Sequence, residues 1–316
     1  MIDNMLVVYD TKYIIMSMIE FIRDFYGSKG VENLTHYIYY HNNETDENRM
    51  ALERYLIYRM SANSTSSFIR NADCDSLEVV IKDYKRLYPW LKSFEVREQS
   101  YENKYELYND KNQIFRGDTM TSVQTTLKRY LYMKLGLNKL PNNINFEEFI
   151  FNNIQYLDIS DDCATFVSMM YCHGNFIPVP QGFNVGRSNA GRWDYWDLTL
   201  DCLYQWYLDN SDEIKNDDDS ALEKLFSHAP EKNRIWAIDN CKQWLKMFDN
   251  WEDFINQNYL KCWVDSDLRP FLLFENHSFE HSVPETLEEM EQLFKNANAL
   301  AINRMIEMGA IDPTAE

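Results

Sequence analysis

Apolar side chains recur at steps of three and four residues near the carboxyl end of this chain, and that spacing restricts the element it can form. It predicts a long amphipathic helix that packs one face into a core. Ser282 and Glu285 have the spacing of an S-x-x-E capping box, and Gly309 follows the last apolar position. We therefore expect the helix to begin just after Ser282 and to end at Gly309. The stripe consists of Leu287, Met290, Phe294, Ala297, Ala301, Met305 and Met308.

Helical patterns also occur along most of the rest of the chain, where Gly and Pro are scarce. The 316 residues include only nine Gly and eight Pro, which favours long regular elements over a many-turned β-sandwich. Alternation between residues 93 and 115 predicts at most a small β-hairpin. We expect a mainly α protein, a multi-helix globular bundle with an N-terminal helical region (1–110) and a C-terminal helical domain (111–316), or one continuous domain. Further helices are expected at 11–26, 46–60, 76–88, 220–228, 231–248 and 251–258.

Acidic residues far outnumber basic ones in this chain. Asp plus Glu number 50 and Lys plus Arg 31, so the formal net charge is −19, and no basic run is longer than two residues. Such a charge repels phosphate backbones, so nucleic acid and anionic membranes are disfavoured as partners. Apolar stretches fall short of the roughly 20 residues of a membrane span, and the first residues lack the basic start of a signal peptide. We expect a soluble, cytoplasmic protein that does not bind a membrane.

The six cysteines are scattered and include no C-x-x-C pair. We expect free thiols in a reducing cytoplasm, and the zinc-ribbon and zinc-finger spacings are absent. The chain also has no phosphate loop, dinucleotide fingerprint or G-x-S-x-G motif. The sequence therefore assigns no metal and leaves both the cofactor and the question of enzymatic activity open.

The stretch CHGNFIPVPQGFNVGRSNAGRWDYWDLTL, residues 172–200, differs from the helical segments around it. The preceding helix, with Ser160 as its expected N-cap, should end near residue 172 with Gly174 as a left-handed C-cap. The following helix should begin at Asp194, with Asp197 completing a capping box. Two prolines hold FIPVP extended, and the glycines permit tight turns or close backbone approach. A loop of about 20 residues, 173–192, is long for a compact domain and suggests a function.

Polar side chains in this loop predict a ligand site. Arg187 and Arg192, above a helix N-terminus, could receive a phosphate or carboxylate group, with Asn189 and Gln181 as further ligands. Alternatively, the arginines pair with some of the many acids, and the amides bond the backbone of the loop itself.

Weaker candidates lie beside this loop. His173 is either a general acid or metal ligand, or a residue that caps its own helix. Asp194, Asp197 and Asp201 share a helix face and could hold a divalent ion, although helix capping explains the first two. The stretch RGDTMTS, residues 116–122, supplies hydroxyls and an expected helix cap at Asp118 or Thr119.

The stretch HGNFIPVPQGFN followed by DYWDLTL resembles an uncharacterised bacterial family with a Gly-Asn-Phe segment, a later Asn and Arg, and an Asp-Leu-Thr-Leu helix start. This resemblance implies no activity. The stretch is also distantly similar to the C-terminal part of HNH endonucleases, which implies catalytic roles for His173, Asn175 and Asn184. Those nucleases need an upstream histidine as base, whereas this chain has none between His41 and His173. The similarity therefore implies a degenerate relative.

Three functions remain open from the sequence. The first is binding of a small anionic molecule or a peptide at residues 173–192. The second is a degenerate HNH-like, metal-dependent nuclease. The third is an interaction protein of a phage-defence or toxin-type system, in which the loop forms an interface with a protein partner.

Overall fold

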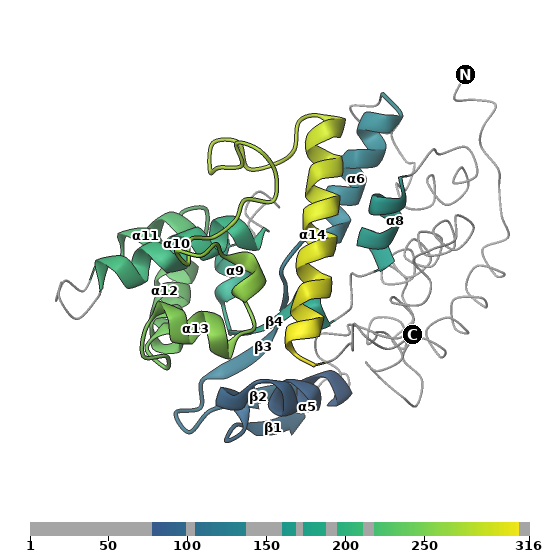
Figure 1. Cartoon of the computed structure of the whole chain (residues 1–316). Helices are drawn as coiled ribbons and strands as arrows, with labels where there is room; N and C mark the ends of the chain where they lie inside the picture. The colour runs from purple at the N-terminus through teal and green to yellow at the C-terminus, as the bar shows by residue number, and fades with distance from the viewer. Residues whose placement is uncertain are drawn as a thin grey trace, which may run out of the picture.

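In the computed structural model, the described residues are 78–98, 105–136, 160–168, 173–187, 195–210 and 218–309. Most of them are helical (Figure 1), so the expected mainly α character is confirmed. The helices expected at 11–26 and 46–60 lie outside these residues. The helices are α5 (Glu78–Leu87), α6 (Val123–Lys134), α8 (Asp161–Ser168), α9 (Phe183–Arg187), α10 (Trp196–Asp209), α11 (Ser220–Leu225), α12 (Glu231–Leu245), α13 (Trp251–Gln257) and α14 (Leu287–Glu307), with 3-10 turns η3 (Pro89–Leu91), η6 (His173–Asn175) and η8 (Lys261–Trp263).

The β structure is larger than the small hairpin expected. Four antiparallel strands form one sheet in the order β1-β2-β3-β4. The extra strand β4 is the FIPVP stretch, and it pairs with β3. Its two prolines are tolerated because β4 lies at a sheet edge, where a missing N–H breaks no ladder. The strands are β1 (Glu95–Glu98), β2 (Tyr105–Tyr108), β3 (Ile114–Thr119) and β4 (Phe176–Pro180).

The boundary expected between residues 110 and 111 lies in the turn between β2 and β3. These two strands pair through Leu107 with Phe115 and through Tyr108 with Ile114. Because residues 1–77 lie outside the described part, the division into two regions stays a prediction.

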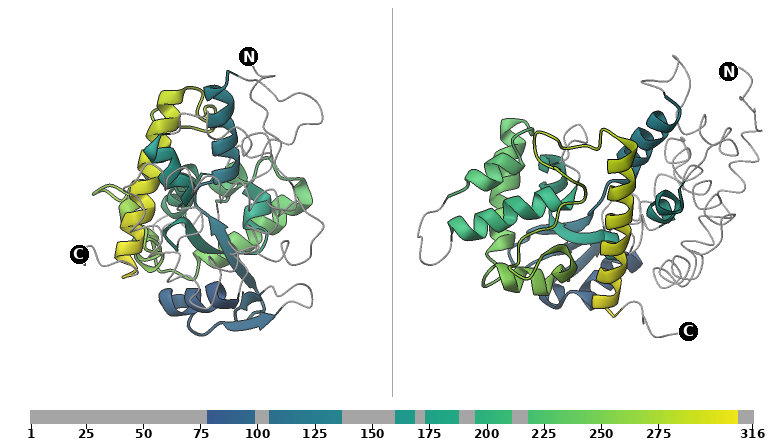
Figure 2. Two further views of the ribbon diagram at one scale, coloured as in Figure 1. Left: turned by 90° about the vertical axis from the view of Figure 1, so that its right-hand side faces the viewer. Right: turned by 45° about the horizontal axis from the view of Figure 1, so that its top comes forward.

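Helix α14 stands between two groups of helices. In Figures 1 and 2, α6 and α8 lie on one side of it and α10 to α13 on the other. Its N-cap is Thr286, whose hydroxyl accepts from the backbone N–H of Glu289, while the Glu289 carboxylate accepts from the backbone N–H of Thr286. The expected capping box of Ser282 and Glu285 is therefore wrong by four residues, because a second T-x-x-E pattern follows it directly. The apolar stripe of this helix packs into the core through Met290, Phe294, Ala297, Ala301 and Met305.

Helix α8 joins α14 and α6 through its N-cap. The Ser160 hydroxyl accepts from the backbone N–H of Cys163 at 3.2 Å, which confirms the expected cap. The same hydroxyl donates to Glu291 of α14 at 2.6 Å, and Tyr130 of α6 donates to the other oxygen of that carboxylate at 3.0 Å. Three helices are thus held together by one serine and one carboxylate. Among the described helices, none has the length and apolarity that crossing a membrane requires.

Candidate functional site

The described part of the expected ligand loop, residues 173–187, is built into the fold. Turn η6 leads directly into β4, all five residues of which are buried, and α9 follows. The extended FIPVP stretch is as expected, but it is a strand that pairs with distant β3 and not part of a free loop.

Gly174 is needed for close packing and not as a helix cap. It lies inside η6 and does not have a positive φ, so the expected left-handed C-cap is wrong. A Cβ added at Gly174 would lie 2.0 Å from the carbonyl oxygen of Ala301 in α14. The absence of a side chain therefore permits the contact between η6 and α14.

His173 lies in the core beside α5. Its Nε2 is 3.5 Å from Oδ2 of Asp83, and its ring makes an edge contact with Tyr84. Burial lowers the pKa of His173, although the neighbouring Asp83 opposes this effect. The imidazole is therefore neutral near pH 7 and shielded from solvent.

The two asparagines of the HNH-like pattern face different surroundings. Asn175 is buried, and its side-chain oxygen accepts from both the backbone N–H and the hydroxyl of Thr121. Asn184 lies on α9 and is exposed. Asn175 thus fastens η6 to the end of β3. The catalytic roles of His173, Asn175 and Asn184 stay a prediction.

Arg187 is fully buried. Its Nη2 donates to Oδ2 of Asp118 at 2.5 Å, and the indole N–H of Trp196 donates to the same oxygen at 3.2 Å. Asp118 and Thr119 belong to β3, and Ser122 is the N-cap of α6, so the cap expected at Asp118 or Thr119 is wrong. The guanidinium has an internal carboxylate partner, as the alternative to anion binding supposed.

The remaining expected ligands are Gln181, Asn189 and Arg192. Asn189 and Arg192 lie outside the described residues. Gln181 is half-buried, and its backbone carbonyl accepts from the side chain of Asn240 in α12 at 3.1 Å. Of the two described ligands, Arg187 pairs with Asp118 and Gln181 bonds α12 through its backbone. Anion binding at 173–192 stays a prediction.

Gly182 supports an exposed aromatic ring. It has φ = +92°, and a Cβ there would lie 2.8 Å from two ring carbons of Trp236 in α12. The indole therefore rests against the turn between β4 and α9, yet 42% of Trp236 remains exposed. A tryptophan fixed on one side and open on the other is a common anchor for binding.

The outward face of α12 carries two further exposed apolar side chains. Ile235 is 53% exposed and Met247, two residues beyond the helix end, is 38% exposed. Trp236, Asn240, Gln243 and Met247 follow one another at steps of four, three and four, so they form one row. We call this row, with its exposed neighbours Ile235, Asp239 and Lys246, the α12 face.

Asp197 and His277 form a buried pair that the sequence did not predict. Asp197 Oδ2 lies 2.5 Å from Nδ1 of His277 and accepts from the backbone N–H of Leu273 at 2.8 Å. Helix α10 has Tyr195 as its N-cap, so the capping box expected from Asp194 and Asp197 is wrong. Asp197 instead holds a distant segment.

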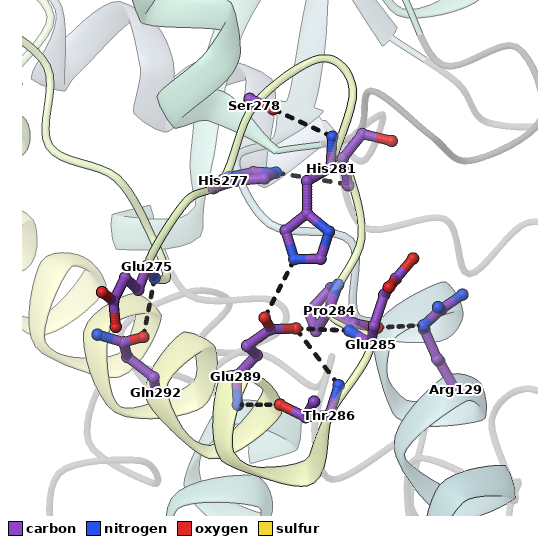
Figure 3. A network of polar contacts seen from close by, with 11 residues as sticks. Arg129, Glu275, His277, Ser278, His281, Pro284, Glu285, Thr286, Glu289 and Gln292 are labelled. Carbon is purple, nitrogen blue, oxygen red and sulfur yellow. Dashed lines mark hydrogen bonds and ion pairs between the residues drawn. The ribbon is translucent and has the colours of Figure 1, made fainter.

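That segment, residues 265–286, is an irregular connection between η8 and α14, and we call it the strap. Figure 3 shows its second half bound to the start of α14. His281 approaches the Glu289 carboxylate at 3.1 Å, and the backbone N–H of Glu275 donates to Gln292 at 2.9 Å. Arg129 of α6 donates to the carbonyl of Pro284. Polar contacts therefore fix the strap at both ends of its second half.

The described part of the chain supports neither metal binding nor chemistry by a reactive thiol. No three His, Cys, Asp or Glu side chains lie there in a metal-binding arrangement. Asp197 bonds His277, Asp201 is exposed, and Asp194 lies outside the described residues. Burial raises the pKa of Cys202 and of Cys262 to about 12, so neither is a thiolate near neutral pH. The four described cysteines are free thiols, as expected.

The sequence contains a signal for the α12 face, which the prediction of a helix at 231–248 did not use. The run Ile235, Trp236, Ala237 and Ile238 places four apolar side chains in succession on one helix. At about 100° per residue they cover most of its circumference, so some of them must point outward. The His277 pair had no comparable signal, because its carboxylate lies 80 residues away.

Comparison with known proteins gives no relative: no family model, curated protein or solved structure matches this chain.

Proposed function

We propose that this chain is an interaction protein that binds another protein through the α12 face. The observation that carries the proposal is Trp236, whose ring is supported by Gly182 and remains 42% exposed beside the more exposed Ile235. Tryptophan dominates the binding energy of many protein interfaces, because a rigid ring covers a large area at little entropic cost. Adjacent apolar residues that stay exposed on a folded domain commonly mark such interfaces.

Catalysis and anion binding at residues 173–192 receive less support. His173, Asn175 and Arg187 all contact other parts of the fold, at Asp83, Thr121 and Asp118. A reacting or binding group needs access to its ligand, whereas these three side chains are buried.

The net charge of −19 indicates the kind of protein partner. Long-range repulsion disfavours strongly acidic partners unless local charges on the two surfaces complement each other. The α12 face itself has charges of both signs, with Asp239 and Lys246 exposed. Local complementarity is therefore available on this face.

The test is a comparison of two exposed aromatic residues. Tagged wild-type protein, Trp236→Ala and Phe271→Ala are recovered from cells that make the chain, and the bound proteins are identified and then produced in pure form. Phe271 is the matched control, since it is 47% exposed but lies on the strap. We expect a pure partner to bind wild type and Phe271→Ala alike and Trp236→Ala at least about tenfold more weakly. Equal binding to all three proteins would contradict the proposal.

A further inference from the structure

We propose that the partner of the α12 face is a second copy of this chain, with the two α12 helices antiparallel about a two-fold axis. The inference rests on the proposed function, since it names the partner of the same surface.

The row on the α12 face is self-complementary when it is reversed. Trp236 lies near one end of the row and Met247 at the other, with Asn240 and Gln243 between them. A two-fold axis between these two amides places Trp236 of each copy opposite Met247 of the other. It also places Asn240 opposite Gln243. Each aromatic ring thereby meets a flexible thioether, which packs well against aromatic faces. Gln243 of each copy meets the half-buried Asn240, whose side-chain nitrogen donates to Gln181 of its own chain.

The charges beside the row complement each other in the same arrangement. Asp239 and Lys246 are exposed on the same flank of the row, about two helical turns apart. In an antiparallel helix pair, the same flanks of the two helices face each other, and residues near one end meet those near the other end. Asp239 of each copy therefore lies near Lys246 of the other, which gives two equivalent ion pairs. In a parallel pair the same flanks would lie on opposite sides of the interface, so these ion pairs would not form.

Two-fold pairing uses the same surface on both copies and closes on itself, so it yields a dimer and not a filament. One helix face is small compared with the surfaces of stable dimers, so the association should be weak and depend on concentration. The net charge of −19 on each copy opposes association at long range, and this repulsion is screened at about 0.15 M salt.

Sedimentation equilibrium at that salt concentration, over a roughly thousandfold range of protein concentration, tests the inference. We expect wild type to pass from monomer to dimer and no further. Trp236→Lys should raise the dissociation constant at least about tenfold, and the control Phe271→Lys should leave it unchanged. Asp239→Lys should weaken the dimer, and combining it with Lys246→Asp should restore the dimer, because the exchange recreates both ion pairs.

Thermal unfolding of each variant verifies that the fold is retained. A wild-type monomer throughout the range would overturn the inference, as would a dimer insensitive to Trp236→Lys. If the chain is monomeric but a different purified protein binds in a Trp236-dependent manner, the second-copy inference is overturned while the proposed function stands. If neither association depends on Trp236, both are overturned.

Discussion

The imidazole of His277 lies 2.5 Å from the carboxylate of Asp197, and the two side chains are wholly buried. The other ring nitrogen faces the carbonyl of Ser282 at 3.4 Å, and the ring stacks on Phe274. The carboxylate of Asp197, in the first turn of α10, thus holds the strap, whose His277 lies 80 residues further along the chain.

Removing this histidine should cost far more stability than removing the other histidine of the strap. His277→Ala leaves the buried Asp197 carboxylate with one fewer donor, so we expect the free energy of unfolding to fall by about 3–5 kcal/mol. His277→Asn, whose amide can replace the Nδ1 donor, should recover part of this loss. Urea denaturation measures these differences.

The matched control is His281→Ala. His281 pairs with Glu289 where both side chains are partly exposed, at 26% and 21%, so its loss should cost less than about 1 kcal/mol. Hydrogen exchange adds a local measurement, because the backbone N–H of Leu273 bonds Asp197 and should exchange faster in His277→Ala. Equal losses in the two alanine variants would show that burial of the Asp197 pair contributes nothing special.

Gly174→Ala should destabilise the protein because η6 and α14 contact each other at Gly174 through backbone atoms on both sides. The new Cβ would lie 2.0 Å from the carbonyl oxygen of Ala301, which α14 holds in place. We expect a loss of about 2–3 kcal/mol in the free energy of unfolding. Gly136→Ala is the control: its Cβ would meet no atom within 4 Å, and only the φ of +61° opposes it, for about 1 kcal/mol. A Gly174→Ala variant as stable as Gly136→Ala would contradict this account of η6.

The helices were largely predictable from the sequence, because each depends on a spacing that recurs within a few residues. Stripes and end signals located α5, α12, α13 and α14 to within a few residues. The start of α14 was misplaced because two capping patterns, at Ser282 and at Thr286, follow each other closely. Only the second has a carboxylate that accepts from the N-cap backbone.

The sheet and the buried polar pairs were not predictable, because their partners are distant in the chain. The FIPVP stretch was correctly expected to be extended, yet nothing local indicates that Arg116 would pair with Val179. Arg187 was expected either to bind an anion or to pair with an acid, but nothing local identifies its partner Asp118, which lies 69 residues upstream. Periodicity in the sequence indicates which face of a helix or strand is buried. It does not indicate which polar group from a distant part of the chain contacts that face.

Arg304 should be among the residues most sensitive to a conservative change. Its buried guanidinium donates to the hydroxyl of Tyr88 and to backbone carbonyls of η6, β4 and the turn after α13. Lysine cannot reach these acceptors at once, since its ammonium is a single point and not a planar fork. Arg304→Lys should therefore lower the free energy of unfolding by about 3 kcal/mol or more, because several buried carbonyls lose their donor.

The control for that change is Arg234→Lys. Arg234 is partly exposed and pairs with a half-exposed Glu223 at 3.1 Å, so the substitution should cost less than about 1 kcal/mol. Denaturant titrations of both variants, compared with wild type, decide the matter. If Arg304→Lys unfolds at the same denaturant concentration as Arg234→Lys, the guanidinium does not link the three segments.

His173 should make the protein less stable in mildly acidic solution. Burial lowers its pKa below the usual value of about 6.5, so between that value and the folded pKa the unfolded chain binds more protons than the folded one. The free energy of unfolding must then fall as the pH drops through this window, by at most about 1.4 kcal/mol per pH unit for one site. Asp83 adds a second loss at lower pH. Its burial alone would raise its pKa, but the hydrogen bonds and charges of His173 and Arg86 lower it overall.

The measurement is urea denaturation of wild type, His173→Asn and His281→Asn from pH 7.5 down to pH 5. His173→Asn removes the titrating group, so its stability should fall less steeply with decreasing pH than that of wild type, even if it is less stable at pH 7.5. His281→Asn should keep the contribution of His173, because His281 belongs to the strap and pairs with Glu289. A pH slope unchanged by His173→Asn would mean that His173 binds its proton equally in both states, and the buried neutral imidazole beside Asp83 would have to be abandoned.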